Sequence, residues 1–462
     1  MNQDILGADG IGDTPYDIPG GSNQDHYPLM NPWGVEGFYL NLADFPMYEA
    51  ESDPGYHEMC GPAVAKMTLD YIWWNSTIYQ EGPPDLFDQA ELYEAGLENN
   101  TNQTSPYLDT QGLWKIIQFN KPEPYDEYGY NFMKYSNENL DEMLKRICLW
   151  INYTIGSVGG YKPGYPLHVP AIVPAYGDYT NWMAIRGFHA NRTAHPMPDD
   201  ITVYGFWVND PYPSTVGGLG ENSYKMLSTW VTDYYQPVET DDYYDGKYVA
   251  IFEPPEIDHD VDFSIAVSEP LFTLDQQRIL TQVQTRSKST SDELKQQTEQ
   301  WIITAAKEGV ASHLLPYDND FAAAFQHTTA ATPLFIENLN GADYYAVPFT
   351  ITKQVKTPGV QQGIHAQENK KTTTIVILID AHDGSFKEAS WVQNPIKYLP
   401  LSESHAIRLI QKKLLKEELT PQDYHYSASL IHRSSTLYYP EWKIIVEETG
   451  RSFFVDQQGG IS

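Results

Sequence analysis

Cys60 is the residue of this chain with the clearest potential for covalent chemistry. It stands in the run EMCGPA at residues 58–63, directly before an apolar pattern with helical spacing. A cysteine at a helix start is a common nucleophile, because amide N–H groups and the helix dipole favour the thiolate over the thiol. A thiol hydrolase also needs an imidazole that exchanges protons with the thiol and a carboxylate or amide that orients the imidazole.

The positions for the base and its orienting group lie on a predicted hairpin. Residues 181–188 and 201–208 are rich in strand-forming types, and a polar, proline-rich loop separates them. This pattern predicts an antiparallel pair that turns near residue 195 and places Asn181 opposite Asp210. The amide of Asn181 cannot replace an imidazole, because it neither accepts nor releases a proton near neutral pH. The candidate site therefore has a thiol and an acid but no proton carrier.

Three histidines could in principle supply the missing base. His57 is predicted to lie on the chain entering the helix, His168 on an earlier strand and His189 in the far loop of the hairpin. His189 is eight residues from Asn181, or roughly 26 Å along an extended strand. Each of the three is therefore interpreted as a surface histidine or as a core histidine with its own partners.

Helical and extended patterns surround these residues. Apolar residues from Val64 to Ile72 fall on one face of a helix predicted to start at Pro62. Further helices are expected over residues 84–98 and 140–153, and strands over residues 170–174, 182–188 and 201–208. Helices followed by strands predict the α+β class.

Residues 40–255 resemble the bacteriocin-processing branch of papain-like cysteine peptidases, peptidase family C-39 and its relatives. The matching features are CGPA at the helix start, DY at the helix end, the strand WMAIRGF and the motif VNDPY, at residues 60–63, 70–71, 182–188 and 208–212. The resemblance implies a papain-like fold, in which a helix packs on an antiparallel sheet.

Carried onto this sequence, the family's nucleophile falls on Cys60 and its orienting carboxylate on Asp210. The family's histidine falls on Asn181, and its oxyanion glutamine falls on Ala50. Two of the four catalytic positions have therefore lost their chemistry. The resemblance implies a degenerate member of the family.

The C-terminal part has a different pattern. Helices are predicted through residues 273–308 with an interruption at 287–291, and another over 402–415; strands are predicted at 343–352, 373–380, 442–447 and 452–456. Residues 374–384 and 442–456 resemble PepSY-type strand pairs, which implies a regulatory or peptide-contacting module beside a peptidase. A generic antiparallel hairpin is the alternative.

The first thirty residues are rich in turn-forming types and form no core of their own. They resemble the closing turn of NosD-type β-helix repeats of exported surface proteins. Asp9 and Asp13 could ligate calcium there, with a solvated turn as the alternative, and no other cofactor is expected. The expected domains are a NosD-type remnant (1–31), a papain-like domain (32–260) and a helical linker with a PepSY-like α+β domain (261–462).

Charge and composition limit the partners. Residues 1–260 carry 39 Asp and Glu against 11 Lys and Arg, and the formal net charge of the chain is −33, which disfavours nucleic acid. No apolar stretch is long enough to span a membrane. The two cysteines allow at most one disulfide, and Cys148 lies in an amphipathic pattern typical of a buried, inert thiol. Five Asn-x-Ser/Thr sequons favour an extracellular or surface protein, at Asn75, Asn99, Asn102, Asn152 and Asn191.

Three functions remain open on this basis. The first is a non-catalytic module that binds a peptide or a cell-envelope component through a peptidase-like cleft. The second is an active cysteine peptidase that uses another histidine. The third is a structural protein of the cell envelope.

Overall fold

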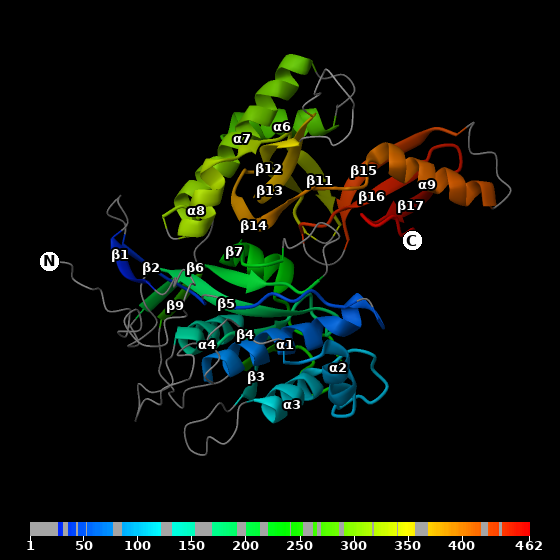
Figure 1. The fold of residues 1–462 in the computed structure, drawn as a ribbon. Helices are drawn as coiled ribbons and strands as arrows, with labels where there is room; N and C mark the ends of the chain where they lie inside the picture. Colours follow the sequence, from blue (N-terminus) through cyan, green and yellow to red (C-terminus); the bar gives the residue numbers. More distant parts are fainter. Residues whose placement is uncertain are drawn as a thin grey trace, which may run out of the picture. The chain divides into compact units, whose positions relative to one another are not determined.

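A computed structural model of the chain (Figure 1) shows two compact units, formed almost entirely by residues 26–265 and residues 269–462. Both contain helices and antiparallel strands, so the predicted α+β class is confirmed. The described residues are 26–30, 36–42, 45–51, 53–76, 86–121, 132–152, 169–191, 200–212, 220–240, 242–252, 262–265, 269–285, 291–316, 318–339, 341–355, 368–416, 424–433 and 437–462.

The first unit is built on a sheet whose central strand is β5. One edge of β5 pairs with β6, and the other edge pairs with β4 and, further along, with β2. All described pairings in this unit are antiparallel except that of β9 with the start of β6. The strands are β1 (His26–Met30), β2 (Glu36–Asn41), β3 (Met133–Asn137), β4 (Ala171–Pro174), β5 (Trp182–Ala190), β6 (Asp200–Asn209), β7 (Ser223–Met226), β8 (Tyr248–Phe252) and β9 (Asp262–Ile265).

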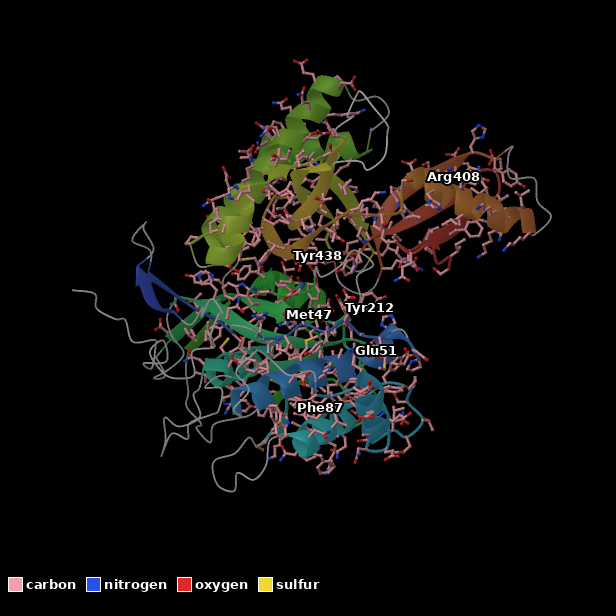
Figure 2. All side chains as sticks on the ribbon, in the orientation of Figure 1. Met47, Glu51, Phe87, Tyr212, Arg408 and Tyr438 are labelled. Atoms are coloured by element: carbon pink, nitrogen blue, oxygen red, sulfur yellow. The ribbon has the colours of Figure 1, made fainter. Side chains whose placement is uncertain are left out.

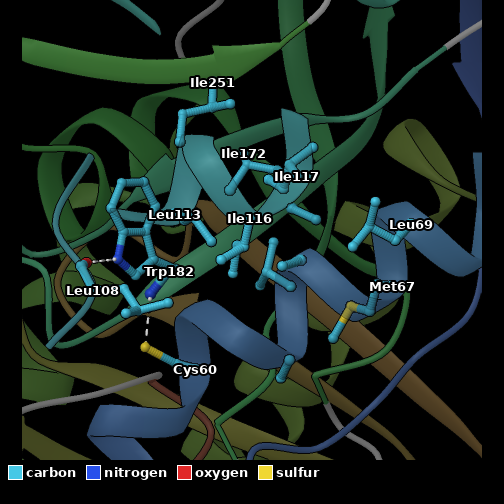
Figure 3. Close-up of a cluster of buried hydrophobic side chains, with 14 of the residues drawn as sticks. Cys60, Met67, Leu69, Leu108, Leu113, Ile116, Ile117, Ile172, Trp182 and Ile251 are labelled. Carbon is cyan, nitrogen blue, oxygen red and sulfur yellow. Dashed lines mark hydrogen bonds between the residues drawn. The ribbon is translucent and has the colours of Figure 1, made fainter. Parts of the chain in front are cut away.

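Helices pack on this sheet and enclose the core. The helices are α1 (Tyr56–Ser76), α2 (Gln89–Leu97), α3 (Thr110–Asn120) and α4 (Leu140–Asn152), with a short α5 (Leu227–Thr229) that continues into a π-helical turn, η2 (Trp230–Tyr234). α1 contacts α2, α3 and β5. Figure 3 shows apolar side chains of α1, α3 and the sheet meeting in this core. Burial of each large apolar side chain contributes roughly 1.5–3 kcal/mol.

α1 begins earlier than the sequence pattern indicates. It starts at Tyr56 rather than Pro62, because the helical hydrogen bonds already begin with Met59 N–H donating to Gly55 C=O at 3.0 Å. Pro62 lies inside the helix, where it removes one backbone hydrogen bond. Cys60 is therefore in the second turn of a helix and not at its first residue.

The hairpin of β5 and β6 forms as predicted but in a different register. Ala184 pairs with Asn209 and Ala190 with Val203, so the turn is centred later than residue 195. Two irregularities in the pairing of β5 accompany this shift. Asn181 is therefore not opposite Asp210. At the open end of the hairpin the register differs from the predicted one by two residues.

The second unit contains two similar blocks of one helix against an antiparallel sheet. α7 contacts β12, β13 and β14, and α9 contacts β15 and β16, which pairs with β17. The elements are α6 (Leu274–Thr285), α7 (Asp292–His313), α8 (Asn319–Gln326), β10 (Thr329–Ala330), β11 (Leu334–Asn338), β12 (Tyr344–Val355), β13 (Glu368–Asp380), β14 (Phe386–Ile396), α9 (Glu403–Lys416), β15 (Tyr426–His432), β16 (Glu441–Val446) and β17 (Arg451–Val455).

The hairpin turns of the two blocks each contain a glycine with a positive φ. Gly384 follows β13 with φ 75°, and Gly450 follows β16 with φ 66°. A positive φ is readily adopted only by glycine, so both turns depend on this residue type. The predicted strand pair near the C-terminus is confirmed as the antiparallel hairpin of β16 and β17.

Candidate functional site

The sulfur of Cys60 is buried and contacts three backbone groups. Its Sγ lies 3.2 Å from the Trp182 N–H, which donates to it, and 3.2 Å from each of the carbonyl oxygens of His57 and Thr180, to which the thiol can donate. Figure 3 shows the contact with Trp182 at the edge of the apolar core. The backbone on both sides of Asn181 therefore closes over the sulfur.

This environment favours the thiol over the thiolate. The pKa of Cys60 is raised to about 12, chiefly by burial and in smaller part by the charges of Asp210 and Asp178, although backbone N–H groups of Trp182 and Gly61 act to lower it. The expected lowering of the pKa by the helix start is therefore outweighed by desolvation. Cys148 on α4 is also buried, and burial raises its pKa well above the ordinary value. Both cysteines are free thiols.

Asn181 occupies the position before β5 where the resemblance places a histidine. Its side chain is 1 % exposed, and neither its Oδ1 nor its Nδ2 has a hydrogen-bond partner among the described residues. Its backbone C=O accepts from Ala175 N–H at 2.7 Å. A buried amide without partners costs about 1–3 kcal/mol for each polar group. The residue is therefore poorly suited to a purely structural role.

Asp210 and Ala50 lie close together, on two segments joined through the backbone. The Ala50 N–H donates to the Pro211 C=O at 2.7 Å. Asp210 is 1 % exposed, and its Oδ1 accepts from the Tyr212 N–H at 3.0 Å. The charge of Asp210 acts to raise the pKa of the Cys60 thiol. Ala50 belongs to the same hydrophobic core cluster as Cys60.

Gln89 of α2 is a residue near Ala50 that sequence reasoning missed. Its Nε2 donates to the Glu49 C=O at 2.8 Å, and its Oε1 accepts from the Glu51 N–H at 3.3 Å. The amide therefore fixes the backbone on both sides of Ala50 and is not a free oxyanion donor. Gln89 is 38 and 40 residues from its two partners in the sequence, so no local pattern could predict these bonds.

The prediction that His57 lies outside the helix is wrong. His57 is in the first turn of α1, three residues before Cys60, which places both on neighbouring helix positions. Its Nδ1 lies 3.2 Å from the Thr180 C=O, the same oxygen that the thiol reaches. Its ring is 5.2 Å from that of Tyr212, which is labelled in Figure 2. Among the described residues, no imidazole nitrogen is hydrogen-bonded to the Cys60 sulfur.

His189 does not reach the thiol. His189 lies within β5 rather than in the hairpin loop, is 3 % exposed and contacts the Tyr224 hydroxyl at 3.2 Å through Nδ1. It stands at the opposite end of β5 from Trp182. His168 lies outside the described residues.

The described ranges contain neither a cluster of metal-ligating side chains nor a helix of membrane-spanning length and apolarity. Within them, no three His, Cys, Asp or Glu side chains are grouped so that they could hold a metal ion. The predicted calcium ligands Asp9 and Asp13 lie outside the described residues. None of the described helices is both long and apolar enough to cross a membrane.

Comparisons of the chain with protein-family models, curated proteins and solved structures gave no match.

Proposed function

We propose that the first unit is a papain-like, cysteine-peptidase-related module that binds peptides without cleaving them. The observation that carries this proposal is the state of Cys60, whose sulfur is hydrogen-bonded to backbone groups among the described residues and whose pKa burial raises to about 12. The amide of Asn181 at the base position supports it, since an amide cannot shuttle the proton. In this proposal the second unit is a pair of PepSY-like blocks, and the protein acts outside the cell or at its surface.

Cys60 is expected to react slowly with iodoacetamide near neutral pH. Because only the thiolate is nucleophilic, a pKa near 12 leaves roughly one thiol in 10⁵ reactive at pH 7. The rate should rise steadily between about pH 8 and 12 and should show no plateau near the ordinary pKa of histidine. Mass spectrometry of the peptide that contains Cys60 measures this rate, and the equally buried Cys148 is the internal control.

The raised pKa of Cys60 also predicts how the stability of the fold depends on pH. The folded pKa lies above the unfolded value, so the contribution of the protonated thiol is fully present below the unfolded pKa. It is lost as the pH rises toward 12. Fast alkylation of Cys60 with a bell-shaped or histidine-like pH profile would contradict the proposed loss of turnover, as would cleavage of casein.

An active peptidase that uses His57 is the second candidate. The specific observation is that His57 Nδ1 and the thiol approach the same Thr180 carbonyl, both at 3.2 Å. Activity would require the imidazole to leave this carbonyl and bond to the sulfur. Any measured cleavage should then disappear in His57→Gln, which retains a polar side chain, and in Cys60→Ala. If both variants cleave at the wild-type rate, the activity does not come from this site.

The sequons give a separate test of the extracellular location. Asn102 is exposed, and its Oδ1 accepts from the hydroxyl of Thr104 at 2.8 Å, whereas Asn152 is 3 % exposed in the last turn of α4. In a host that modifies exported sequons, we expect Asn102 to carry a glycan and Asn152 to remain unmodified. Glycopeptide mass spectrometry measures both sites. Full occupancy of Asn152 would contradict the packing of α4, and an unmodified Asn102 would argue against export.

The remaining sequons are less informative. Asn75 lies within α1, and Asn99 donates from Nδ2 to the Ala95 C=O at 2.8 Å. Asn191 accepts from the Thr202 N–H at 2.9 Å through Oδ1. A glycan at Asn99 would be attached to the same Nδ2 that donates this bond, whereas a glycosylated Asn191 would keep the Oδ1 that accepts from Thr202.

A further inference from the structure

A pocket of about 530 Å³ opens in the first unit beside the segment that closes over Cys60. It is lined by the loop at 101–109, by residues 178–180 and by the turn at 240–243. Thr180 belongs to this lining, and its carbonyl oxygen is the one that contacts the Cys60 sulfur. The volume falls in the range of small-ligand sites, roughly 300–1,000 Å³. We propose that this pocket binds a cationic group, the guanidinium or ammonium of an arginine or lysine side chain in a bound peptide.

The charge of the lining is the first support. Asp109, Asp178 and Asp242 line the pocket, and no Lys, Arg or His is among its described lining residues. Two described lysines interact with groups of this region. Burial lowers the pKa of Lys134, which bonds to Gln111, whereas the charge of Asp109 raises it, and Lys247 bonds to the Tyr243 C=O at 3.0 Å. A ligand with a positive charge would therefore be attracted by a surplus of negative charge.

The direction of the hydrogen bonds is the second support. Three of the hydroxyl groups that line the pocket already donate to aspartates of the same lining. Tyr179 donates to Asp242 Oδ2 at 3.0 Å, Thr240 to Asp242 Oδ1 at 2.8 Å and Thr180 to Asp178 Oδ1 at 2.5 Å. These three hydroxyls are therefore not free to donate to a ligand, whereas a carboxylate oxygen can accept more than one hydrogen bond. Ammonium and guanidinium groups donate hydrogen bonds and accept none, whereas a sugar hydroxyl needs both kinds of partner.

Aromatic rings are the third support. Tyr107, Tyr179 and Tyr243 line the pocket, and the Tyr243 side chain is 75 % exposed. Its ring already carries the Lys247 ammonium 3.7 Å from its centre, which shows that a cation can lie against this ring. A positive group between ring faces and carboxylates gains cation–π attraction, worth about 0.5–2 kcal/mol. Tyr179 is held in place by stacking on Trp182 at 5.6 Å.

The inference rests on the proposed peptide-binding function, because a peptide lying across the Cys60 segment would direct a side chain into this pocket. The test uses the full chain, produced without glycosylation because Asn102 lines the pocket. Two probes are compared by calorimetry at low salt: acetyl-Gly-Arg-Gly-amide and its citrulline counterpart, which has nearly the same shape but no charge. The arginine peptide should bind at least about tenfold more tightly, and added salt should weaken it.

Two variants locate the interaction in the pocket. Asp178→Asn keeps the oxygen that accepts from the Thr180 N–H at 2.8 Å but removes the charge, and Tyr243→Ala removes an exposed ring. Each should weaken the arginine peptide about fivefold to tenfold and leave the citrulline peptide unchanged. Asp275→Asn, on an exposed helix position of the second unit, is the matched control and should have no effect.

The possible results separate the two proposals. Equal binding of both peptides would overturn the cationic pocket and retain peptide binding. Binding of neither peptide would overturn both. Binding of a neutral oligosaccharide that is lost in Tyr243→Ala and kept in Asp178→Asn would assign the pocket to sugars and overturn the inference.

Discussion

Asn181→His is expected to raise the rate at which Cys60 is alkylated at pH 7 by about a hundredfold. A positive charge within about 4–6 Å lowers the pKa of an acidic group by roughly 1–3 units, and each unit raises the thiolate fraction tenfold. Position 181 is suitable because the backbone groups on both sides of it contact the sulfur, through the Thr180 C=O and the Trp182 N–H. Asp210 lies near enough to influence the same thiol and could orient the new imidazole.

Two further variants make this experiment specific. Asn181→Leu has a similar branched shape without an exchangeable proton, so it should leave alkylation unchanged. It should also stabilise the fold slightly, because it removes a buried amide that lacks partners among the described residues. In the double variant Asn181→His/Asp210→Asn, Cys60 should be alkylated about tenfold more slowly than in Asn181→His, because the imidazole loses its orienting charge. An unchanged alkylation rate in a folded Asn181→His protein would show that position 181 does not face the thiol.

Trp182→Ala is expected to destabilise the first unit by about 3–5 kcal/mol, the range for removal of a fully buried tryptophan. The Trp182 side chain is 0 % exposed, stacks on Tyr179 and donates from Nε1 to the Leu108 C=O at 2.9 Å. It also packs on α1, where a Cβ at Gly61 would lie 3.3 Å from the indole. The variant leaves a cavity between the helices and the sheet.

Hydrogen exchange of α1 measures this loss within the first unit, because the two units need not unfold together. Trp182→Phe keeps an aromatic ring but loses the bond to Leu108, and should cost about 1–2 kcal/mol. Phe119→Ala, at a side chain that is 64 % exposed, is the control and should change stability by less than about 0.5 kcal/mol. Equal protection of α1 in the Trp182→Ala and Phe119→Ala proteins would show that Trp182 does not hold the core together.

Local patterns predicted most of the elements. The helix expected from residue 140 is α4 and begins at Leu140. α6 ends at Thr285 and α7 begins at Asp292, and most of the interruption expected at residues 287–291 lies outside the described residues. The helix expected from residue 84 begins later, at Gln89, because the Asp88 carboxylate caps the N–H groups of Ala90 and Glu91. Helical periodicity and caps depend on neighbouring residues, so a single sequence contains this information.

Pairing between distant segments was less predictable. The hairpin of β5 and β6 was predicted from residue types, but its register was wrong by two residues, because residue types do not show which residues face each other across two strands. The bonds from Gln89 to the segment around Ala50, and the pocket beside Thr180, join residues dozens of positions apart. No local pattern reports such contacts.

The sequence alone predicted which groups the candidate site contains: the thiol of Cys60, the acid of Asp210 and the amide of Asn181 at the position where the resemblance implies an imidazole. Only the tertiary structure decided the chemical state of that thiol. Residue type and helix position favour a reactive thiolate, but residues 180–182 cover the sulfur and exclude water from it. Burial of the thiolate raises the pKa of the thiol more than the helix dipole lowers it. Burial depends on the whole fold and not on local residue types.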